Sequence, residues 1–232
     1  MTTPWNKGLS KLTDPSVRKI SETLRSKKID NFRRWREEAK EKGIIPASYP
    51  AFKRNGDLAE LIGVILGDGN ISEFPRTERL IISANSRNEG FIKRYSGLVG
   101  EIVKKSPTVS LAKDSNCTRI SVYQKFLSKR FGIPAGSRKK LKFETPLWIR
   151  RSGDYSKRFI RGLFEAEGSL SIHLKSGTYN LAFTNTNPSL LTAVYDLLKR
   201  FEFHPERRYN AVRIRRKNEV EQFLRLICFR EY

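Results

Sequence analysis

Two acidic residues stand at equivalent places in two similar segments of the chain. Asp68 closes residues 61–68 and Glu167 closes residues 160–167, and a glycine follows each acid. Both segments read as apolar helices, and a carboxylate in the last turn of a helix opposes the helix dipole. Two such carboxylates side by side are oxygen ligands of the kind that divalent cations take. The pattern therefore favours a metal site.

Small residues recur four positions apart in each segment. They are Gly63 and Gly67 in the first segment, and Gly162 and Ala166 in the second. Residues i and i+4 share one helix face, so each helix carries a stripe on which another backbone can approach closely. We predict that the two helices pack along these stripes and bring their terminal acids together.

The charge balance points to a polyanionic partner. The chain has 232 residues and 38% hydrophobic content, enough for a core, and its 46 Lys and Arg outnumber its 24 Asp and Glu, for a net charge of +22. Such an excess favours nucleic acid, although charge alone leaves a structural RNA binder open. The sequence contains no apolar stretch of membrane-spanning length, so we expect no membrane partner.

Cysteine and histidine are scarce and scattered. Cys117 and Cys228 have no neighbour at zinc-ligand spacing, and His173 and His204 are isolated, which argues against a zinc centre. The first residues lack the apolar core of a secretory signal. We therefore expect an intracellular protein, in the cytoplasm, nucleoid or an organelle matrix, that is not secreted.

The same order of predicted elements occurs twice after residue 56. Each motif helix precedes a strand (79–85, then 180–185), a helix (88–103, then 188–201), further strands (108–112 and 118–124, then 211–216) and a last helix (126–131, then 220–228). Asp68 lies 85 − 68 = 17 residues before Asn85, and Glu167 lies 185 − 167 = 18 residues before Asn185. Duplicated units of helices and antiparallel strands predict an α+β pseudo-dimer.

The chain divides into three predicted parts. Residues 1–55 form a basic, mostly helical extension, with a helix over about 15–42 that begins at Asp14-Pro15. Residues 56–150 hold the first half and a connection, and residues 151–232 hold the second half. The connection contains the basic run 137–140, which is either solvated or in contact with phosphate.

The two motifs resemble those of the LAGLIDADG homing endonucleases in their single-chain, double-motif form. The resemblance rests on GDG at 67–69, FIRGLFEAEG at 159–168, and GIP at 132–134 followed by PLWI at 146–149. It covers roughly residues 57–232. The sequence departs from the family pattern at Leu66, which replaces the first acid, and at Glu165 and Glu167, which replace aspartates. The resemblance implies two αββαββα halves, motif helices on the pseudo-twofold axis, and a saddle of antiparallel strands over the DNA major groove.

The resemblance also implies an activity and its metal ligands. It implies metal-dependent phosphodiester hydrolysis in both strands of one long, roughly pseudo-palindromic DNA site, leaving short 3′ overhangs. Asp68 and Glu167 would bind the metal with the carbonyls of Gly67 and Ala166. We expect Mg²⁺, with Mn²⁺ as a substitute and Ca²⁺ binding without supporting cleavage. The ions would activate water and stabilise the leaving oxygen.

The family places polar and basic side chains around the metals. By this resemblance Asn85 and Asn185, at the ends of two predicted strands, are candidates to orient water. Lys217 is the candidate to stabilise the transition state in the second half, and Gln124 or Lys125 is its counterpart in the first.

DNA reading is expected from the strands. Apolar residues alternate in 79–85 and 211–217, so the intervening side chains share the other sheet face. Arginine on such a face suits guanine edges and phosphates. The predicted DNA-contacting residues are Arg79, Ser83, Arg87, Lys113, Arg119, Lys175, Arg207, Arg208, Arg213 and Arg215.

The N-terminal part has a resemblance of its own. WNKG at 5–8 and KISETLR at 19–25 resemble a small DNA-binding module appended to mobile-intron nucleases. A plain basic helical tail is the alternative.

Three functions remain open from the sequence. They are a homing endonuclease, an intron RNA maturase on the same fold, and a DNA-binding regulator without catalysis. The pair Asp68 and Glu167 favours the endonuclease over the regulator, because a binder needs no acids beside phosphate. The internal duplication predicts a monomer on double-stranded DNA, and intron RNA is the additional partner if the chain is a maturase.

Overall fold

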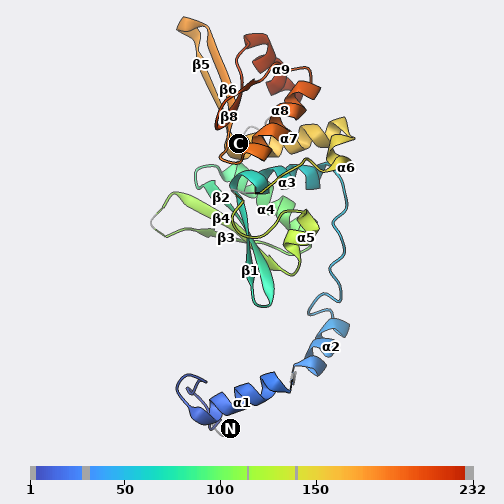
Figure 1. Cartoon of the computed structure of the whole chain (residues 1–232), viewed down its shortest axis with the longest axis vertical. Coiled ribbons are helices and arrows are strands. Elements are labelled where there is room, and N and C mark those ends of the chain that lie inside the picture. The colour runs from blue at the N-terminus through green and yellow to red at the C-terminus, as the bar shows by residue number, and fades with distance from the viewer. Residues whose placement is uncertain (1–3, 28–31, 114, 139–140, 228–232) are drawn as a thin grey trace. The chain divides into compact units, whose positions relative to one another are not determined.

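The computed structural model describes residues 4–27, 32–113, 115–138 and 141–227. It divides into two compact units, Met1–Tyr49 and Pro50–Tyr232. Figure 1 labels the helices and strands of both units.

The first unit contains two helices, α1 (Pro15–Ser26) and α2 (Arg33–Glu41). Asp14 caps α1 as the sequence predicts, because its carboxylate accepts a hydrogen bond of 3.0 Å from the Val17 N–H. The single helix expected over 15–42 is instead interrupted after Ser26, and residues 28–31 lie outside the described part of the chain.

The second unit is built from two halves with the same order of elements. The first half comprises α3 (Gly56–Asp68), β1 (Gly69–Phe74), β2 (Thr77–Asn85), α4 (Glu89–Val103), β3 (Thr108–Leu111), β4 (Cys117–Gln124) and α5 (Leu127–Phe131). The second half follows α6 (Leu147–Arg150) and comprises α7 (Gly153–Glu167), β5 (Gly168–His173), a 3₁₀ turn (Leu174–Ser176), β6 (Thr178–Thr184), α8 (Pro188–Arg200), β7 (Glu206–Arg207), β8 (Ala211–Ile214) and α9 (Lys217–Ile227).

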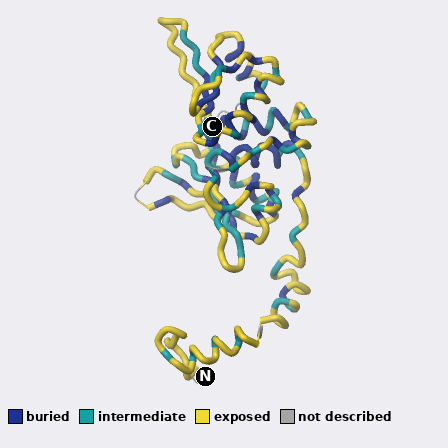
Figure 2. Tube along the Cα trace, in the orientation of Figure 1, coloured by how far each residue is buried: buried dark blue, intermediate teal, exposed yellow. Residues whose placement is uncertain are grey.

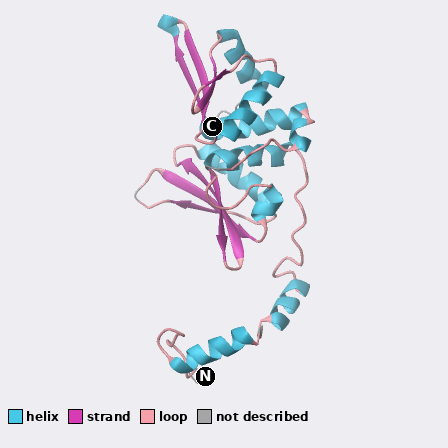
Figure 3. Cartoon of the chain, in the orientation of Figure 1, coloured by secondary structure: helices cyan, strands magenta, loops and turns pink. Residues whose placement is uncertain are grey.

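Each half holds one antiparallel sheet. The strand order is β1-β2-β4-β3 in the first sheet and β5-β6-β8-β7 in the second, so the duplication inferred from the sequence extends to the topology. The α+β fold class is confirmed. Figure 3 shows the two groups of strands with α3 and α7 between them.

The predicted alternation of β2 is confirmed by burial. Leu80 and Ile82 face the core and are almost fully buried, whereas Arg79, Ile81 and Ser83 lie on the more exposed face. The register carries this pattern across the sheet, since Ile82 pairs with Ile120 of β4.

Some strand predictions were incomplete. The strands β1 and β5, which start at the glycine after each motif helix, and the two-residue β7 were not predicted. The last predicted strand was too long, since β8 ends at Ile214. Arg215 therefore follows the strand, and Lys217 begins α9.

The core centres on the two motif helices. Figure 2 shows buried residues concentrated along α3 and α7, which lie side by side. A β-carbon on Gly63 would lie 2.4 Å from the Phe159 carbonyl oxygen, and one on Gly162 would lie 2.1 Å from the Glu60 carbonyl oxygen. The two backbones thus touch along the small-residue stripes, which leaves no room for side chains there.

Candidate metal centre at the seam of two helices

The two acids end the two packed helices. Asp68 is the last residue of α3 and Glu167 is the last residue of α7. A β-carbon on Gly67 would lie 2.5 Å from the β-carbon of Ala166 and 3.1 Å from the γ-carbon of Glu167. The close approach of the helices therefore continues to their final residues and brings both carboxyl groups to one place.

A glycine turns each helix directly into a strand. Gly69 donates its N–H to the Ile65 carbonyl, and Gly168 donates its N–H to the Phe164 carbonyl. A β-carbon on Gly69 would lie 2.6 Å from the Ile65 α-carbon, and one on Gly168 would lie 2.3 Å from the Phe164 carbonyl oxygen. The sharp turn from helix to strand therefore requires the glycine that follows each acid.

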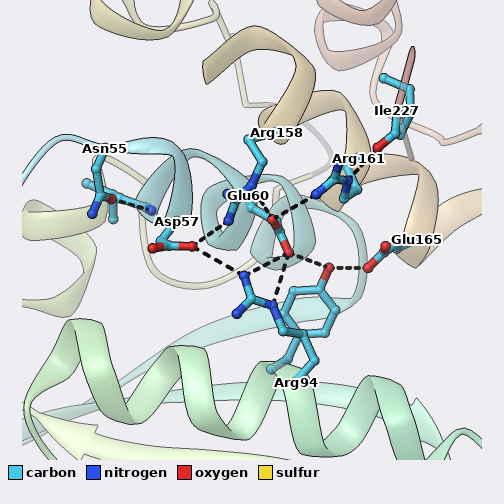
Figure 4. A network of polar contacts seen from close by, with 10 residues as sticks. Asn55, Asp57, Glu60, Arg94, Arg158, Arg161, Glu165 and Ile227 are labelled. Atoms are coloured by element: carbon cyan, nitrogen blue, oxygen red, sulfur yellow. Dashed lines mark hydrogen bonds and ion pairs between the residues drawn. The ribbon is translucent and has the colours of Figure 1, made fainter. Parts of the chain in front are cut away.

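A network of ion pairs connects the two motif helices, α3 and α7, with α4 (Figure 4). Glu60 of α3 is fully buried and forms ion pairs with Arg94 of α4 at 3.4 Å and with Arg158 of α7. Asp57 pairs with the same two arginines. Buried charges of this kind are costly unless they are paired, so the network holds α3, α4 and α7 in one register.

The surroundings of both carboxylates disfavour their charged forms. Burial, and secondarily the charge of Glu167, raises the pKa of Asp68 to about 7 from its ordinary 3.8. Burial also raises the pKa of Glu167, against the opposing effect of Arg138. A cation between the two acids would relieve both effects.

Arg138, from the connection between the halves, borders the same place. Its Nη1 and Nη2 donate to the carbonyl oxygens of Ile65 and Gly69 at the end of α3. A cleft of about 220 Å³ lies here, lined by Leu66, Gly67, Arg138, Leu141, Phe143, Glu167, Asn185, Thr186, Asn187 and Leu190. From the sequence, the run 137–140 was predicted to be either solvated or in contact with phosphate, so Arg138 was not identified as a site residue.

The donors at the seam suit a hydrated metal. Within the described residues no three His, Cys, Asp or Glu side chains cluster as ligands. The carboxylates of Asp68 and Glu167 are the two acidic donors at the end of the packed helices, and the carbonyls of Gly67 and Ala166 stay the predicted main-chain ligands. Mg²⁺ characteristically takes one or two carboxylates and fills its other positions with water and phosphate oxygens. The arrangement therefore fits a metal bound together with nucleic acid.

The two predicted asparagines lie at equivalent strand ends. Asn85 is the last residue of β2, and its side-chain oxygen accepts from the Arg87 N–H at 3.0 Å. Asn185 follows β6, and its side-chain oxygen accepts from the Asn187 N–H at 2.9 Å. Asn185 also lines the cleft that contains Glu167, so the structure brings Asn185 and Glu167 to one place.

The candidate transition-state residues of the first half are not at the acids. Gly69, next to Asp68, pairs with Ile82, and Ile82 pairs with Ile120. Gln124 lies four residues further along β4, which is about 13 Å of strand, and Lys125 follows it. The Gln124 side chain is buried, donating to the Val103 carbonyl at 3.1 Å and accepting from Arg130. The register therefore carries Gln124 away from the acids, and the structure does not bring the two together.

Lys217 also lies away from the level of the acids. Gly168 pairs with Phe183, and Phe183 pairs with Val212, so Lys217 is five residues beyond the level of Glu167. It starts α9, where its ammonium lies 4.0 Å from the Glu221 carboxylate and 5.8 Å from the Tyr179 ring centre. The predicted strand end did not exist, and the lysine points to these neighbours.

The exposed face of the first sheet gathers three predicted DNA contacts. Ser83 pairs with Arg119, and Arg79 pairs with Tyr123 on the same face. The Arg79 guanidinium lies over the rings of Phe74 and Tyr123, at 5.2 and 5.8 Å from their centres. These stacking contacts hold the Arg79 side chain along the non-core face of the sheet.

The other predicted DNA contacts are more dispersed. Arg213 of β8 pairs with Ala182 and Glu206, which places it on the non-core face of the second sheet. Arg207 pairs with the buried Val212 and turns toward the Pro188 carbonyl at 3.4 Å, so it does not share the face of Arg213. The rest occupy loops or turns beside strands: Arg87, Lys113, Lys175, Arg208 and Arg215.

We predict an unusual pH dependence of stability for the metal-free protein. Because folding raises the pKa of Asp68 from 3.8 to about 7, the folded state binds more protons than the unfolded state in this window. Stability then falls as pH rises from about 4 to about 7, by at most about 4 kcal/mol before solvent screening. Urea unfolding in EDTA between pH 5 and 8 measures this fall.

Asp68→Asn is the control for that experiment, since it removes the Asp68 carboxyl and keeps Glu167, whose pKa is also raised by burial. The carboxyls of Asp57 and Glu219 have lowered pKa values, held down against burial by arginine or histidine partners, so they stay ionised throughout this range. A wild-type curve that is as flat as that of Asp68→Asn between pH 5 and 7 would contradict the prediction.

Comparisons with known proteins agree with this architecture. Residues 154–231 match the family model of a LAGLIDADG-like domain. The homing endonuclease I-DmoI in complex with DNA and Mn has a TM-score of 0.54 at 19% identity, over 76% of this chain and 98% of I-DmoI. Full-length DUF199/WhiA from Thermatoga maritima has a TM-score of 0.54 at 20% identity, over 79% of this chain and 59% of that protein. Curated protein sequences contain no match to the chain.

At these identities the structural likeness establishes the fold, and the family model covers the second half. The resemblance seen in the sequence is confirmed: the chain has the LAGLIDADG fold, with the architecture of I-DmoI across both halves and a LAGLIDADG-like domain in the second.

Proposed function

We propose that this protein is a site-specific DNA endonuclease of the homing type, which hydrolyses both strands of one long target with Mg²⁺ or Mn²⁺. The observation that carries the proposal is the meeting of Asp68 and Glu167 at the helix seam, in a place where the pKa of each carboxyl is raised. A pure DNA binder has no use for two acids that cost stability. The I-DmoI structure of the same fold was solved with DNA and Mn, which supports the same partner and metal class here.

In this proposal the protein supplies the metal ligands and the shape of the site. Asp68 and Glu167, with the carbonyls of Gly67 and Ala166, would hold the metal at the seam. The metal would supply an activated water and charge stabilisation at the leaving oxygen. The glycine turns and the buried Glu60 network keep the two carboxylates fixed before DNA arrives, which lowers the cost of organising the site on binding.

The two sheets would bind the duplex. Their non-core faces carry Arg79 and Arg119 in the first half and Arg213 in the second, and the net charge of +22 supplies sequence-independent attraction to phosphate. Because both halves belong to one chain, a single copy would cover one pseudo-palindromic site.

The N-terminal residues 1–55 would act as an appended DNA-contacting module. None of the described helices has the length and apolarity to cross a membrane.

The fold alone does not assign cleavage, since a likeness at 19–20% identity establishes the fold and no activity. The paired acids favour the endonuclease over a non-cutting binder. Intron RNA remains the partner to test if the chain binds nucleic acid without cutting.

The test is a two-stage assay on wild-type protein. Duplex DNA of random sequence is first selected for binding in Ca²⁺, and the enriched site is then incubated with Mg²⁺ or Mn²⁺. We expect double-strand cutting within the selected site, with 3′ overhangs and one protein per DNA. Specific, salt-sensitive binding without cutting in either metal would overturn the endonuclease proposal and direct the same assay to intron RNA.

A further inference from the structure

Arg138 connects the linker between the halves to the end of the first motif helix. Its guanidinium donates to the carbonyl oxygens of Ile65 and Gly69, on either side of Asp68. A cation at the C-terminal end of a helix is favoured by the helix dipole. The last turn of α3, which carries one of the two acids, is therefore held by a residue outside both motifs.

The main chain at Arg138 is fixed by the second half. Asn187 is buried at the N-terminus of α8, and its Nδ2 donates to the carbonyl oxygens of Arg138 at 2.7 Å and Leu141 at 2.9 Å. Its side-chain oxygen accepts from the N–H groups of Ser189 and Leu190. Asn187 is thus fully engaged in holding the linker, and Arg138 bridges the two halves beside the seam.

The cleft that Arg138 lines belongs to one of the two acids. Its lining includes Glu167 and Asn185 of the second half but not Asp68. A ligand in this cleft therefore lies beside Arg138 and Glu167 together.

The guanidinium retains donors for a ligand. Arginine has five N–H groups in a fixed planar fork, and hydrogen bonds from two of its nitrogens go to α3. Arg138 also lines the cleft that contains Glu167 and Asn185. Planar guanidinium groups suit phosphate oxygens, and a DNA backbone at the seam would bring phosphate to this cleft.

We propose that Arg138 contacts a backbone phosphate of one DNA strand in the Glu167 cleft, which makes the two cutting positions unequal. This inference rests on the proposed endonuclease function and goes beyond it. The strand in the Glu167 cleft is oriented by a protein cation, whereas the other strand depends on the remaining ligands of the seam. Loss of Arg138 then slows one strand selectively.

The first experiment follows a supercoiled plasmid carrying the selected site through its nicked form to linear DNA. A linear duplex with the same site, labelled at the end of one strand or the other, gives the cutting rate of each strand. Arg138→Met is expected to slow one strand at least about 10-fold and the other less than about 3-fold, so that nicked DNA accumulates. Arg138→Lys restores part of the rate, because it keeps the charge without the planar fork. Arg151→Met is the matched control, since Arg151 is exposed on the connection and does not line this cleft.

A second readout needs no metal. Binding to the target in EDTA is measured at several salt concentrations, and the slope of log K against log salt is expected to fall by about 1 in Arg138→Met and to stay unchanged in Arg151→Met. Equal slowing of both strands with an unchanged slope would overturn the inference and reduce Arg138 to a fold-supporting role. If Arg138→Met does not fold, the strand ratio of Arg138→Lys decides alone, because lysine keeps the charge that sets the salt slope. Wild type that cuts neither strand removes the endonuclease proposal itself, which the same gel shows separately.

Discussion

Asp68→Asn and Glu167→Gln are each expected to lower the cleavage rate of both strands by more than about 100-fold. Replacing residues that merely orient metal ligands commonly costs 10- to 100-fold, and these two changes remove a ligand itself. The described residues offer no third acid at the seam that would replace the lost carboxylate. The rate is measured under single-turnover conditions in Mg²⁺ and in Mn²⁺, with DNA binding in Ca²⁺ checked in parallel.

Asp68→Asn is also expected to stabilise the metal-free protein. Asp68 is kept partly buried beside Glu167, which raises its pKa to about 7, so its ionised form is disfavoured by folding. A neutral amide at this position removes that cost and raises the melting temperature at pH 8 in EDTA. A carboxylate that only capped the turn would give the opposite result, since its removal lowers stability.

Glu165→Gln serves as the matched control for both measurements. Glu165 is an acid of the same helix and motif, two residues before Glu167, and it accepts a hydrogen bond from the Tyr95 hydroxyl. Its replacement is expected to keep cleavage within about 3-fold of wild type. A loss as large as that of Glu167→Gln would show that negative charge on α7, rather than ligation by one residue, supports the activity.

The elements that the sequence predicted well are those specified by local patterns. Each apolar motif helix is followed by a glycine, because the turn there has no room for a β-carbon. The strand β2 alternates between buried and more exposed residues, such as Ile82 and Ser83. These features depend on a few neighbouring residues, so sequence reading captures them. The meeting of Asp68 with Glu167 followed from the same local features together with the duplication.

The predicted positions of Lys217 and Gln124 differ from the structure, because they depend on where strands end and on strand register. Lys217 was assigned to a strand because arginines and isoleucine alternate before it, but the chain enters α9 there, where Arg216 pairs with Glu219. Gln124 was placed near the metal by analogy between the halves, although the pairing of β2 with β4 carries it to the far end of the sheet. Neither outcome is set by residues close in sequence.

Two omissions have separate causes. The strands β1 and β5 start directly at the motif glycines, so no turn residues separate helix from strand in the sequence. Arg138 lies in a basic loop run, and its position depends on Asn187, which is 49 residues away. A buried asparagine capping a helix after the connection was the one signal that this loop is anchored.

Gly162→Ala is expected to destabilise the protein by about 3 kcal/mol or more. A β-carbon there would lie 2.1 Å from the Glu60 carbonyl oxygen and 3.0 Å from the Val64 nitrogen, both in the backbone of α3. Overpacking a tight core usually costs about 1–3 kcal/mol, and here the obstacle is main chain that cannot rotate away. The two helices must separate, which pulls Asp68 from Glu167, so cleavage falls together with stability.

Gly97→Ala is the matched control, because the same methyl group is added within a helix where nothing lies within 4 Å. Gly97 is exposed in α4, and alanine at an open helical position is favoured over glycine by roughly 0.5–1 kcal/mol. Urea unfolding of both variants therefore should move the midpoint in opposite directions. Similar stabilisation of both would mean that α3 and α7 do not touch at Gly162, and the convergence of the two acids would lose its structural basis. Opposite shifts with loss of cleavage in Gly162→Ala alone would tie the activity to the closeness of this helix pair.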